Sequence, residues 1–242
     1  MALSVVSHRQ GDWLLKLLQG LKGCSGLGTV HVTANCPGSL PETPLPMPAV
    51  VHENKVPRGF GANHNQALRN AHEPYLCVIN PDISLLQDPF PGLMDCLKRT
   101  GAGVVAPQVV SPGGRPEDNA RAFPGVGDLV LKALRLSDGR VSLGTEPAQR
   151  VGWVAGMFML FRREAFAAVG GFDEGFHLYY EDVDICARLW RLGHSVLVSP
   201  DVRVIHDARR ESRRNPQYMV WHARSMARYF RKHWLRIPDQ VP

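Results

Sequence analysis

Apolar and polar positions along the first half of the chain follow two alternating periods. Five short apolar runs have the length and the flanking turn residues of buried strands. They lie at residues 3–6, 29–35, 49–54, 75–80 and 103–110. Three intervening segments carry apolar side chains at helical spacing, namely 12–21, 63–72 and 89–100. Strands that alternate with helices through short links predict an α/β domain with a mostly parallel sheet.

The second half begins with a long irregular segment. Residues 111–150 are rich in Gly, Pro and charges with little periodicity, so we expect a long loop over the sheet that forms a lid or binds substrate. The pattern then becomes regular again. We expect a strand at 151–161, helices at 163–172 and 181–192, strands at 195–200 and 202–206, and an amphipathic helix at 216–234.

Composition is that of an ordinary globular protein. Of 242 residues, 44% are hydrophobic and 21% are charged, which is enough for one substantial core. No apolar run reaches the roughly 18 residues of a membrane span, and the first residues lack the pattern of a secretory signal. Five cysteines without a C-x-x-C pair are typical of reduced thiols. We therefore expect a cytoplasmic location.

Positive charge is concentrated near the C-terminal end. The formal net charge is +6, and ten of the basic residues lie between 203 and 236. They are Arg203, Arg209, Arg210, Arg213, Arg214, Arg224, Arg228, Arg231, Lys232 and Arg236. Such a cluster could bind nucleic acid, an anionic membrane surface or a phosphorylated substrate. No nucleic-acid-reading motif accompanies it, so we expect no nucleic-acid partner.

Two short motifs fall at predicted strand ends or helix starts. Residues 80–82, Asn-Pro-Asp, follow an apolar strand and could be either a plain turn or a point where Asp82 holds a divalent cation. The Gly-x-Gly at 59–61 precedes a helix, but it lacks the third glycine of a dinucleotide-binding fingerprint. Taken by itself, neither motif decides the function.

The stretch "FHLYYEDVDICARL" (176–189) sets Glu181, Asp182 and Asp184 directly behind two tyrosines. Acidic residues in the first turn of a helix are favoured by its free N–H groups and its dipole. The alternative is that one carboxylate is a base held in a cleft. Both interpretations fit the stretch alone.

Three segments together resemble a known family. "GFGANHNQA", "LCVINPDISL" and the run from "GWVAGMF" to "VRVIH" follow one another, in order and spacing, as in family 2 glycosyltransferases of the rhamnosyltransferase-like branch. The resemblance covers about residues 3–206. It implies the α/β GT-A fold, with a single nucleotide-binding, mostly parallel sheet. A GT-A domain at 1–206 would follow, with a donor half at about 1–110 and an acceptor half at about 111–206. We expect the basic segment 207–242 to form a helical extension packed on the same domain.

The resemblance also implies catalytic roles. Asp182 matches the general base, Glu181 is its catalytic neighbour, and Asp184 is expected to be structural. Trp153, Gly156 and Tyr180 would shape the acceptor side. The aromatics Phe176, Tyr179 and Tyr180 would wall the sugar site and exclude water.

Metal and donor contacts carry over in the same way. Asp82 and His206 would hold Mg²⁺ or Mn²⁺, with Asn80 in place of a first acid. The nucleotide sugar would be contacted by Ser7, His8, Asn35, Asn54, Gly59, Asn63, Asn65, Asn80 and Asp82. Ala34 and Pro57 depart from the family pattern, which leaves the nucleotide open.

The function implied is an inverting, metal-dependent transfer of a sugar, rhamnose or another hexose, from a nucleotide-diphosphate sugar. The acceptor would be a hydroxyl of a cell-surface polysaccharide or of a glycan precursor linked to polyprenyl diphosphate. The C-terminal helix could rest on the anionic cytoplasmic face of the inner membrane or pack on the domain. The alternative is a non-catalytic module that binds a nucleotide sugar on the same fold.

Overall fold

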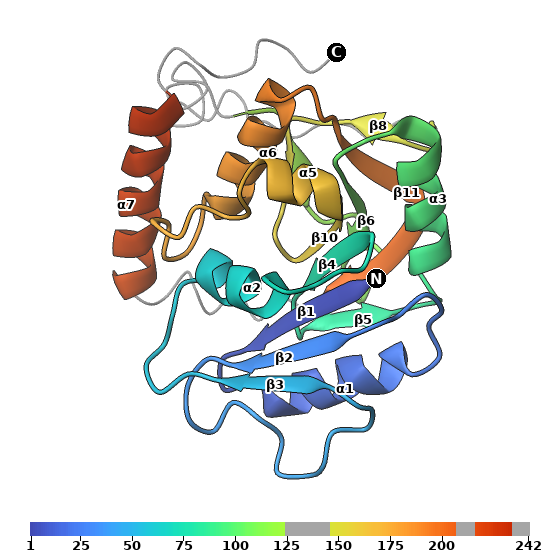
Figure 1. Cartoon of the computed structure of the whole chain (residues 1–242), viewed down its shortest axis with the longest axis vertical. Coiled ribbons are helices and arrows are strands. Elements are labelled where there is room, and N and C mark those ends of the chain that lie inside the picture. The colour runs from blue at the N-terminus through green and yellow to red at the C-terminus, as the bar shows by residue number, and fades with distance from the viewer. Residues whose placement is uncertain (124–145, 207–215, 234–242) are drawn as a thin grey trace.

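The computed structural model describes residues 1–123, 146–206 and 216–233 (Figure 1). Within them, the main sheet has nine strands in the order β3-β2-β1-β4-β10-β6-β11-β5, with β8 also paired to β11. Its strands are β1 (Ala2–Ser7), β2 (Val30–Ala34), β3 (Val50–Glu53), β4 (Tyr75–Ile79), β5 (Ile83–Leu85), β6 (Val104–Val110), β8 (Gln149–Arg150), β10 (Phe158–Arg162) and β11 (Val196–His206). A two-stranded sheet joins β7 (Ala120–Arg121) to β9 (Trp153–Val154).

Six helices accompany the sheet among the described residues. They are α1 (Gly11–Leu21), α2 (Phe60–Leu68), α3 (Phe90–Thr100), α5 (Arg163–Ala168), α6 (Glu181–Arg191) and α7 (Pro216–His233). The mixed order of strands and helices confirms the predicted α/β class. Helix α5 is shorter than the predicted 163–172 because Gly170 and Gly171 take left-handed φ values of 73° and 71°, which end it.

The strands depart from the predicted pattern in three places. The apolar run 151–161 forms two strands separated by a turn, because β9 pairs with β7 in the small sheet whereas β10 pairs with β4 and β6 in the main sheet. The predicted pair 195–200 and 202–206 forms one strand, β11, with a register shift between Ser199 and Arg203. Strand β5 was not predicted, since three residues are too short to show a period.

Most of the sheet is parallel, as expected. Strands β3, β2, β1 and β4 run parallel to one another, and β6 runs parallel to β11. Strand β10 lies antiparallel between β4 and β6. Of the irregular segment 111–150, the structure describes both ends, which carry β7 and β8; residues 124–145 lie outside the described part, and the predicted lid falls mostly on them.

Two apolar clusters fill the two faces of the sheet. Alternate residues of β4 point to opposite faces: Cys77 and Ile79 pack with α1 and α3, whereas Leu76 and Val78 pack with α2, α5 and α6. On α1, four leucines at helical spacing are buried against the first cluster, namely Leu14, Leu17, Leu18 and Leu21. Helices therefore cover both faces, as a mostly parallel sheet requires.

Helix α7 stands beside α6 on the second face (Figure 1). Its residues Ser225, Tyr229 and His233 are buried, and the Ser225 hydroxyl donates to the Leu178 carbonyl at 2.8 Å. The amphipathic helix predicted at 216–234 thus packs on the domain; Trp234 and the basic segment 207–215 lie outside the described residues. Over the ranges that the structure covers, no helix has the combined length and apolarity that a membrane crossing requires.

Two helical glycines differ in the space beside them. A Cβ on Gly61 of α2 would lie 2.6 Å from Phe172 Cβ, whereas one on Gly20 of α1 would have its nearest neighbours, two atoms of the Leu85 side chain, at 4.0 Å. Replacing glycine by alanine favours a helix by up to about 1 kcal/mol, but overpacking costs about 1–3 kcal/mol.

We therefore expect Gly61→Ala to lower the free energy of unfolding by roughly 0.5–2 kcal/mol, because the clash outweighs the helical gain. The matched control Gly20→Ala should raise it by about 0.5–1 kcal/mol. Urea unfolding of the two variants and the wild type measures both effects. Equal shifts for the two variants would contradict the close packing of α2 on Phe172.

Candidate active site

The carboxyl end of β4 brings two segments together. Ile79 pairs with Phe158 at the start of the antiparallel β10, so the turn before β10 lies at the edge where β1 and β4 end. The Asn80 N–H donates to the Met157 carbonyl at 2.9 Å. Ligands of open α/β sheets bind beyond the carboxyl ends of the strands, so this edge is the candidate site.

Asp182 lies in the first turn of α6, against that turn. Its Oδ2 accepts a hydrogen bond from the Gly156 N–H at 3.0 Å, and its Oδ1 accepts one from the Val183 N–H at 2.9 Å. Burial raises the pKa of Asp182, and these hydrogen bonds oppose the rise only in part. The structure thus brings together Asp182 and Gly156, two of the residues that the sequence singled out.

Glu181, the preceding residue, is buried at 4% exposure, and among the described residues its Oε2 has no hydrogen-bond partner. Burial raises the pKa of Glu181 well above its usual value, and the neighbouring charge of Asp182 adds to the rise. Glu181 therefore holds its proton more tightly than an ordinary carboxyl group. Of the adjacent pair, Asp182 is the residue suited to be the carboxylate.

Asp82 and His206 form a second polar group. Residues 80–83 make a tight turn, in which the Ile83 N–H approaches the Asn80 carbonyl at 3.3 Å, and this turn places Asp82 just before β5. His206 ends β11, and its Nε2 lies 3.3 Å from Asp82 Oδ2. The other carboxylate oxygen, Oδ1, is buried and has no partner within the described ranges. The Asn-Pro-Asp motif is therefore a turn, and this turn places the Asp82 carboxylate next to the His206 ring.

His206 also contacts Glu117, which the sequence did not indicate. The Nδ1 of His206 lies 2.9 Å from Glu117 Oε2. Burial alone would lower the pKa of His206, but Asp82 and Glu117 outweigh it and raise the pKa to about 8. No cluster of three or more His, Cys, Asp or Glu side chains converges on one metal position in the part of the chain that the structure describes.

Three of the asparagines predicted to contact the donor form hydrogen bonds with one another and with Arg58. The Asn35 side chain donates to the Arg58 carbonyl at 3.0 Å and accepts from the Arg58 N–H at 2.8 Å. Asn54 donates to Asn35 at 2.9 Å and to Asn63 at 2.7 Å. This network holds the segment before Gly59, the N-cap residue of α2, so these asparagines shape the edge rather than leave their amides free.

The other predicted donor residues are placed differently. Ser7, at the end of β1, is buried and donates to the Ser39 carbonyl at 2.6 Å, whereas His8 is exposed. Partial desolvation of the ring and then the nearby charge of Arg9 lower the pKa of His8. The side chain of Asn65 donates to the Phe172 carbonyl at 2.9 Å and accepts from the Phe172 N–H at 2.9 Å. Asn65 thus fastens α2 to the loop before α6.

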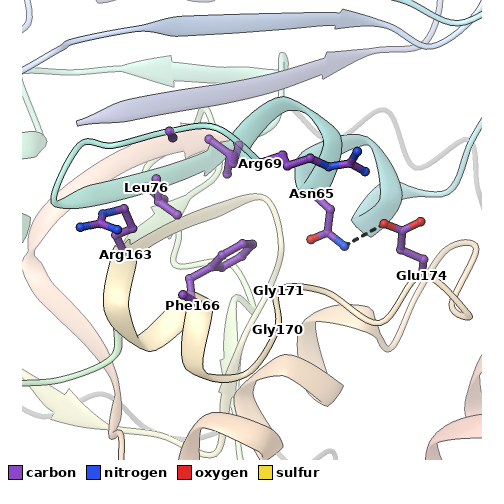
Figure 2. Close-up of a pocket in the computed structure, with 11 residues that line it drawn as sticks. Asn65, Arg69, Leu76, Arg163, Phe166, Gly170, Gly171 and Glu174 are labelled. Carbon is purple, nitrogen blue, oxygen red and sulfur yellow. Dashed lines mark hydrogen bonds between the residues drawn. The ribbon is translucent and has the colours of Figure 1, made fainter.

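A cavity of about 360 Å³ lies beside Asn65, between α2 and α5 (Figure 2). Arg69, Arg163, Phe166 and Glu174 are among its lining residues. Neither Asp182 nor Asp82 lines it. The candidate chemistry therefore belongs to the strand ends and not to this cavity.

The aromatic residues before α6 have separate roles. Tyr179 and Tyr180 both take left-handed φ values, 70° and 65°, which are strained for a non-glycine residue. Tyr180 packs against His222 and Tyr229 of α7. Phe176 is fully buried beneath cations of α7, so the prediction that it walls the sugar site is wrong. It is a core residue because the loop 172–180 folds under α7.

Trp153 lies on β9, just before the turn that carries Gly156. Its indole N–H donates to the Ala122 carbonyl at 3.0 Å, which fixes the ring against the β7 segment. A Cβ on Gly156 would lie 3.0 Å from the Phe60 ring, so glycine lets the turn approach α2. Trp153 and Gly156 thus lie on neighbouring parts of one short strand and turn.

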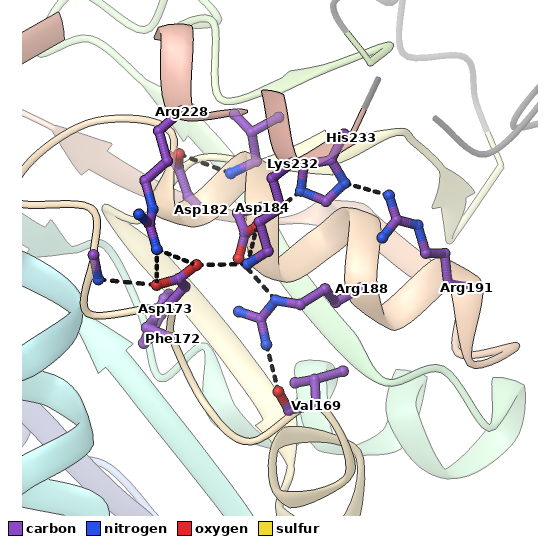
Figure 3. Close-up of polar contacts among 12 residues, drawn as sticks. Val169, Phe172, Asp173, Asp182, Asp184, Arg188, Arg191, Arg228, Lys232 and His233 are labelled. Carbon is purple, nitrogen blue, oxygen red and sulfur yellow. Dashed lines mark hydrogen bonds and ion pairs between the residues drawn. The ribbon is translucent and has the colours of Figure 1, made fainter. Parts of the chain in front are cut away.

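Asp184 anchors α6 to α7 (Figure 3). This carboxylate is fully buried and accepts from Arg188 at 2.7 Å, Lys232 at 2.7 Å and His233 at 2.8 Å. Burial works to raise its pKa, but the His233 hydrogen bond and the two cations prevail and lower it. The interaction confirms that Asp184 has structural partners, which the sequence predicted only as a helix-start acid.

Asp173 provides a second link to the same helix (Figure 3). It accepts from Arg228 at 2.9 Å and from Lys232 at 2.6 Å. Burial would raise the pKa of Asp173, but these partners lower it to about 2. Lys232 therefore bridges the loop before α6 and the first turn of α6.

The family comparison covers most of this site. Residues 79–233 match the family model described as glycosyl transferase family group 2. Rhamnosyltransferase WbbL of Escherichia coli (strain K12) is 28% identical over 239 residues, which cover 93% of this chain and 90% of that protein. N-acetylglucosaminyl-diphospho-decaprenol L-rhamnosyltransferase of Mycobacterium tuberculosis (strain ATCC 25618 / H37Rv) is 31% identical over 182 residues, 65% of this chain and 58% of that protein.

Solved structures share the fold. GalNAc-T7 with UDP, GalNAc and Mn²⁺ superposes with a TM-score of 0.62 at 15% identity, covering 87% of this chain and 44% of that one. Mannosyltransferase PcManGT from Pyrobaculum calidifontis, in complex with GDP-Man and Mn²⁺, gives 0.59 at 15% identity, covering 94% and 64%. This chain spans less than two thirds of either. The likeness shows that the fold is GT-A, as the sequence predicted.

Glu181 makes a testable contribution to stability. A carboxyl group whose folded-state pKa is raised stabilises the fold fully below its unfolded pKa, and that contribution is lost as pH rises through the folded pKa. Glutamine does not ionise, so Glu181→Gln should not lose stability in this way as the pH rises. The difference in free energy of unfolding between the variant and the wild type should therefore move in favour of the variant as the pH rises above about 4, the usual pKa of a glutamate.

Urea unfolding at several pH values measures this difference. Glu164→Gln is the matched control for loss of a glutamate carboxylate, because that side chain is 68% exposed, where it pairs with Arg162. A pH-independent difference for Glu181→Gln would contradict a buried Glu181 that resists ionisation.

Proposed function

Because the chain belongs to glycosyl transferase family group 2, we propose that it transfers a sugar with inversion from a nucleotide-diphosphate sugar to an acceptor hydroxyl, with Asp182 as general base. The observation that carries this proposal is the placement of Asp182 at the start of α6, hydrogen-bonded to Gly156 beside the carboxyl ends of β1 and β4. A carboxylate fixed at a rigid helix start is suited to accept a proton in a defined direction.

The electrostatics support one base rather than two. Burial beside another carboxyl group raises the pKa of Glu181 well above its usual value, so Asp182 is the better suited of the two to carry the negative charge. The raised pKa of Asp182 makes it a stronger base than a solvated aspartate. In a single inverting displacement, Asp182 would take the proton of the acceptor hydroxyl as that oxygen attacks the anomeric carbon and the nucleoside diphosphate leaves.

Donor and acceptor follow from the relatives. Two relatives are named as rhamnosyltransferases, which supports L-rhamnose as the sugar moved, with another hexose as the second choice. The mycobacterial protein is named for an acceptor on a decaprenyl diphosphate, which supports a glycan precursor linked to a polyprenyl diphosphate. The structures named above, in complex with UDP and GDP-Man, support a nucleotide-sugar donor. The nucleotide itself stays open, because Ala34 and Pro57 depart from the family pattern.

A divalent cation, Mg²⁺ or Mn²⁺, fits the pair Asp82 and His206. The buried, unpartnered Oδ1 of Asp82 is a hard oxygen ligand without a protein partner among the described residues, and the nearby His206 Nε2 is a nitrogen ligand. Asp82 and His206 would be the protein ligands that hold the cation. When bound, the cation would neutralise charge on the leaving diphosphate. The Mn²⁺ in two neighbouring structures is consistent with this choice.

The two halves of the chain would then bind different substrates. Residues 1–110 would form the donor half, which includes Ser7, His8 and the Asn35–Asn54–Asn63 network. Residues 111–206 would form the acceptor half, with Trp153, Gly156 and Tyr180, and 207–242 the packed extension. Strain at Tyr180 is consistent with a functional position.

Contact with a membrane would use the outer face of α7. Met219 and Val220 are 66% and 47% exposed there, and the exposed Arg224 and Arg231 follow along the same helix. Apolar side chains among arginines suit the surface of an anionic bilayer. We place the enzyme in the cytoplasm, at the cytoplasmic face of the inner membrane, where a lipid-linked acceptor would be reached.

Loss of the base tests the reaction. Asp182→Asn should lower kcat by roughly 10²- to 10⁴-fold, because the amide cannot accept the proton, while donor binding is kept. Transfer and donor hydrolysis are measured with UDP-, dTDP- and GDP-sugars and a polyprenyl-diphosphate acceptor. Glu181→Gln is the matched control and should retain activity within about tenfold. If Glu181→Gln lost as much activity as Asp182→Asn, the assignment of the base to Asp182 would be wrong.

Loss of the metal ligand tests the cation. Asp82→Asn should weaken Mn²⁺ binding at least about tenfold, measured by electron paramagnetic resonance of free Mn²⁺ in the presence of UDP or dTDP. Asp95→Asn, on the exposed face of α3, is the control and should bind as the wild type does. Equal affinity of Asp82→Asn and wild type would remove Asp82 from the metal site.

A further inference from the structure

His206 lies between two carboxylates that face different ring nitrogens. Its Nδ1 is 2.9 Å from Glu117 Oε2, and its Nε2 is 3.3 Å from Asp82 Oδ2. All three side chains are largely withdrawn from solvent, with exposures of 12% for His206, 21% for Glu117 and 18% for Asp82. We propose that Glu117 is a positioning residue that fixes the orientation and tautomer of His206. The role of Glu117 toward a cation rests on the function proposed above.

The ring geometry separates the roles of the two carboxylates. The two nitrogens of an imidazole point away from each other, so an acceptor at Nδ1 cannot share a ligand position with a group at Nε2. Glu117 accepts from the Nδ1–H, and the lone pair of the neutral ring then stays on Nε2, toward Asp82. Glu117 therefore prepares His206 to be a ligand without being one itself.

Three neighbouring strands hold this arrangement. On one side, His206 of β11 pairs with Ile83 of β5, immediately after Asp82. On the other side, β11 runs parallel to β6, with Ile205 opposite Val110. All these contacts are backbone pairings. The register of the sheet therefore places the side chain of His206 next to Asp82.

Glu117 is fastened to the same sheet by its own backbone. Its N–H donates to the Val109 carbonyl at 2.8 Å, after a turn at residues 111–115 reverses the chain. The buried Asn119 side chain donates to the Pro107 carbonyl at 2.8 Å and accepts from the Val109 N–H at 3.3 Å, which clamps the returning segment to β6. The Glu117 carboxylate is thus held at a defined place beside His206.

The chemical effect expected is that of an outer carboxylate on a metal-binding histidine. Such partners fix the tautomer, raise the basicity of the ligating nitrogen and contribute about 10- to 100-fold to metal affinity. A glutamine at 117 could still accept from the Nδ1–H through its amide oxygen, but it would lack the negative charge. Alanine would leave Nδ1 without this acceptor. The two substitutions therefore separate charge from hydrogen bonding.

The tautomer is read first, without any metal. In ¹⁵N-histidine spectra at about pH 9.5, above the raised pKa of His206, the ring is neutral. The signals of His206 are those absent from His206→Asn. We expect the Nδ1–H tautomer in the wild type and the Nε2–H tautomer, donating to Asp82, in Glu117→Ala. A merely structural role for Glu117 would leave the tautomer unchanged.

Metal affinity is read second, by Mn²⁺ titration in the presence of UDP or dTDP with electron paramagnetic resonance detection. Glu117→Ala should weaken Mn²⁺ binding by about 10- to 100-fold and Glu117→Gln by less. Asp118→Asn is the matched control: it removes the same charge next in sequence, from a carboxylate that pairs with Arg121, and should leave affinity unchanged. Thermal melting of each variant checks that it is folded.

The outcomes separate the two proposals. An unchanged tautomer together with unchanged Mn²⁺ affinity in Glu117→Ala would overturn the role of Glu117 alone. Mn²⁺ binding that is absent in the wild type, or that is indifferent to Asp82→Asn, would overturn the metal site of the proposed function. An equal loss of affinity in Asp118→Asn and Glu117→Gln would show a general effect of charge and would also overturn the positioning role.

Discussion

The free-energy cost of burying charge governs the first turn of α6, and much of the structure around the candidate base depends on how that cost is met. Three acids within four residues meet it in three ways. Asp184 is fully buried and is surrounded by Arg188, Lys232 and His233. Glu181 is buried without a cation, and its pKa is raised well above the usual value, so it holds its proton more tightly. Asp182 remains partly exposed and accepts two backbone hydrogen bonds.

The partners of Asp184 explain why α7 belongs to the catalytic domain. Lys232 and His233 come from the end of α7, and Lys232 also binds Asp173 in the loop before α6. That loop ends in the left-handed Tyr179 and Tyr180, whose strain costs about 1–3 kcal/mol each. Aromatic packing and ion pairs from α7 offset this cost. A strained entry to α6 therefore depends on a helix that lies 30 residues or more further along the chain.

The sequence predicted what local patterns determine. Leucine spacing on α1, the apolar run of β4 and the acidic start of α6 each follow from neighbours in the chain, and the structure has them nearly as predicted. Glu117 could not be predicted, because it meets His206 only through the register of β6 and β11. Nor could the sequence show that Asn35, Asn54 and Asn63 bond to one another and to Arg58, since side-chain partners across a fold leave no periodic signal.

The end of β4 is the common anchor of the proposed base and of the pair Asp82 and His206. Ile79 pairs with Phe158, which places the turn that binds Asp182, and three residues later Asp82 enters the turn that leads to β5. The Asn80 N–H joins the two turns through the Met157 carbonyl. This link uses only the backbone of residue 80. An asparagine can therefore stand where the family resemblance expects an acid without disturbing the scaffold, and in the proposed function Asp82 would supply the negative charge for a cation.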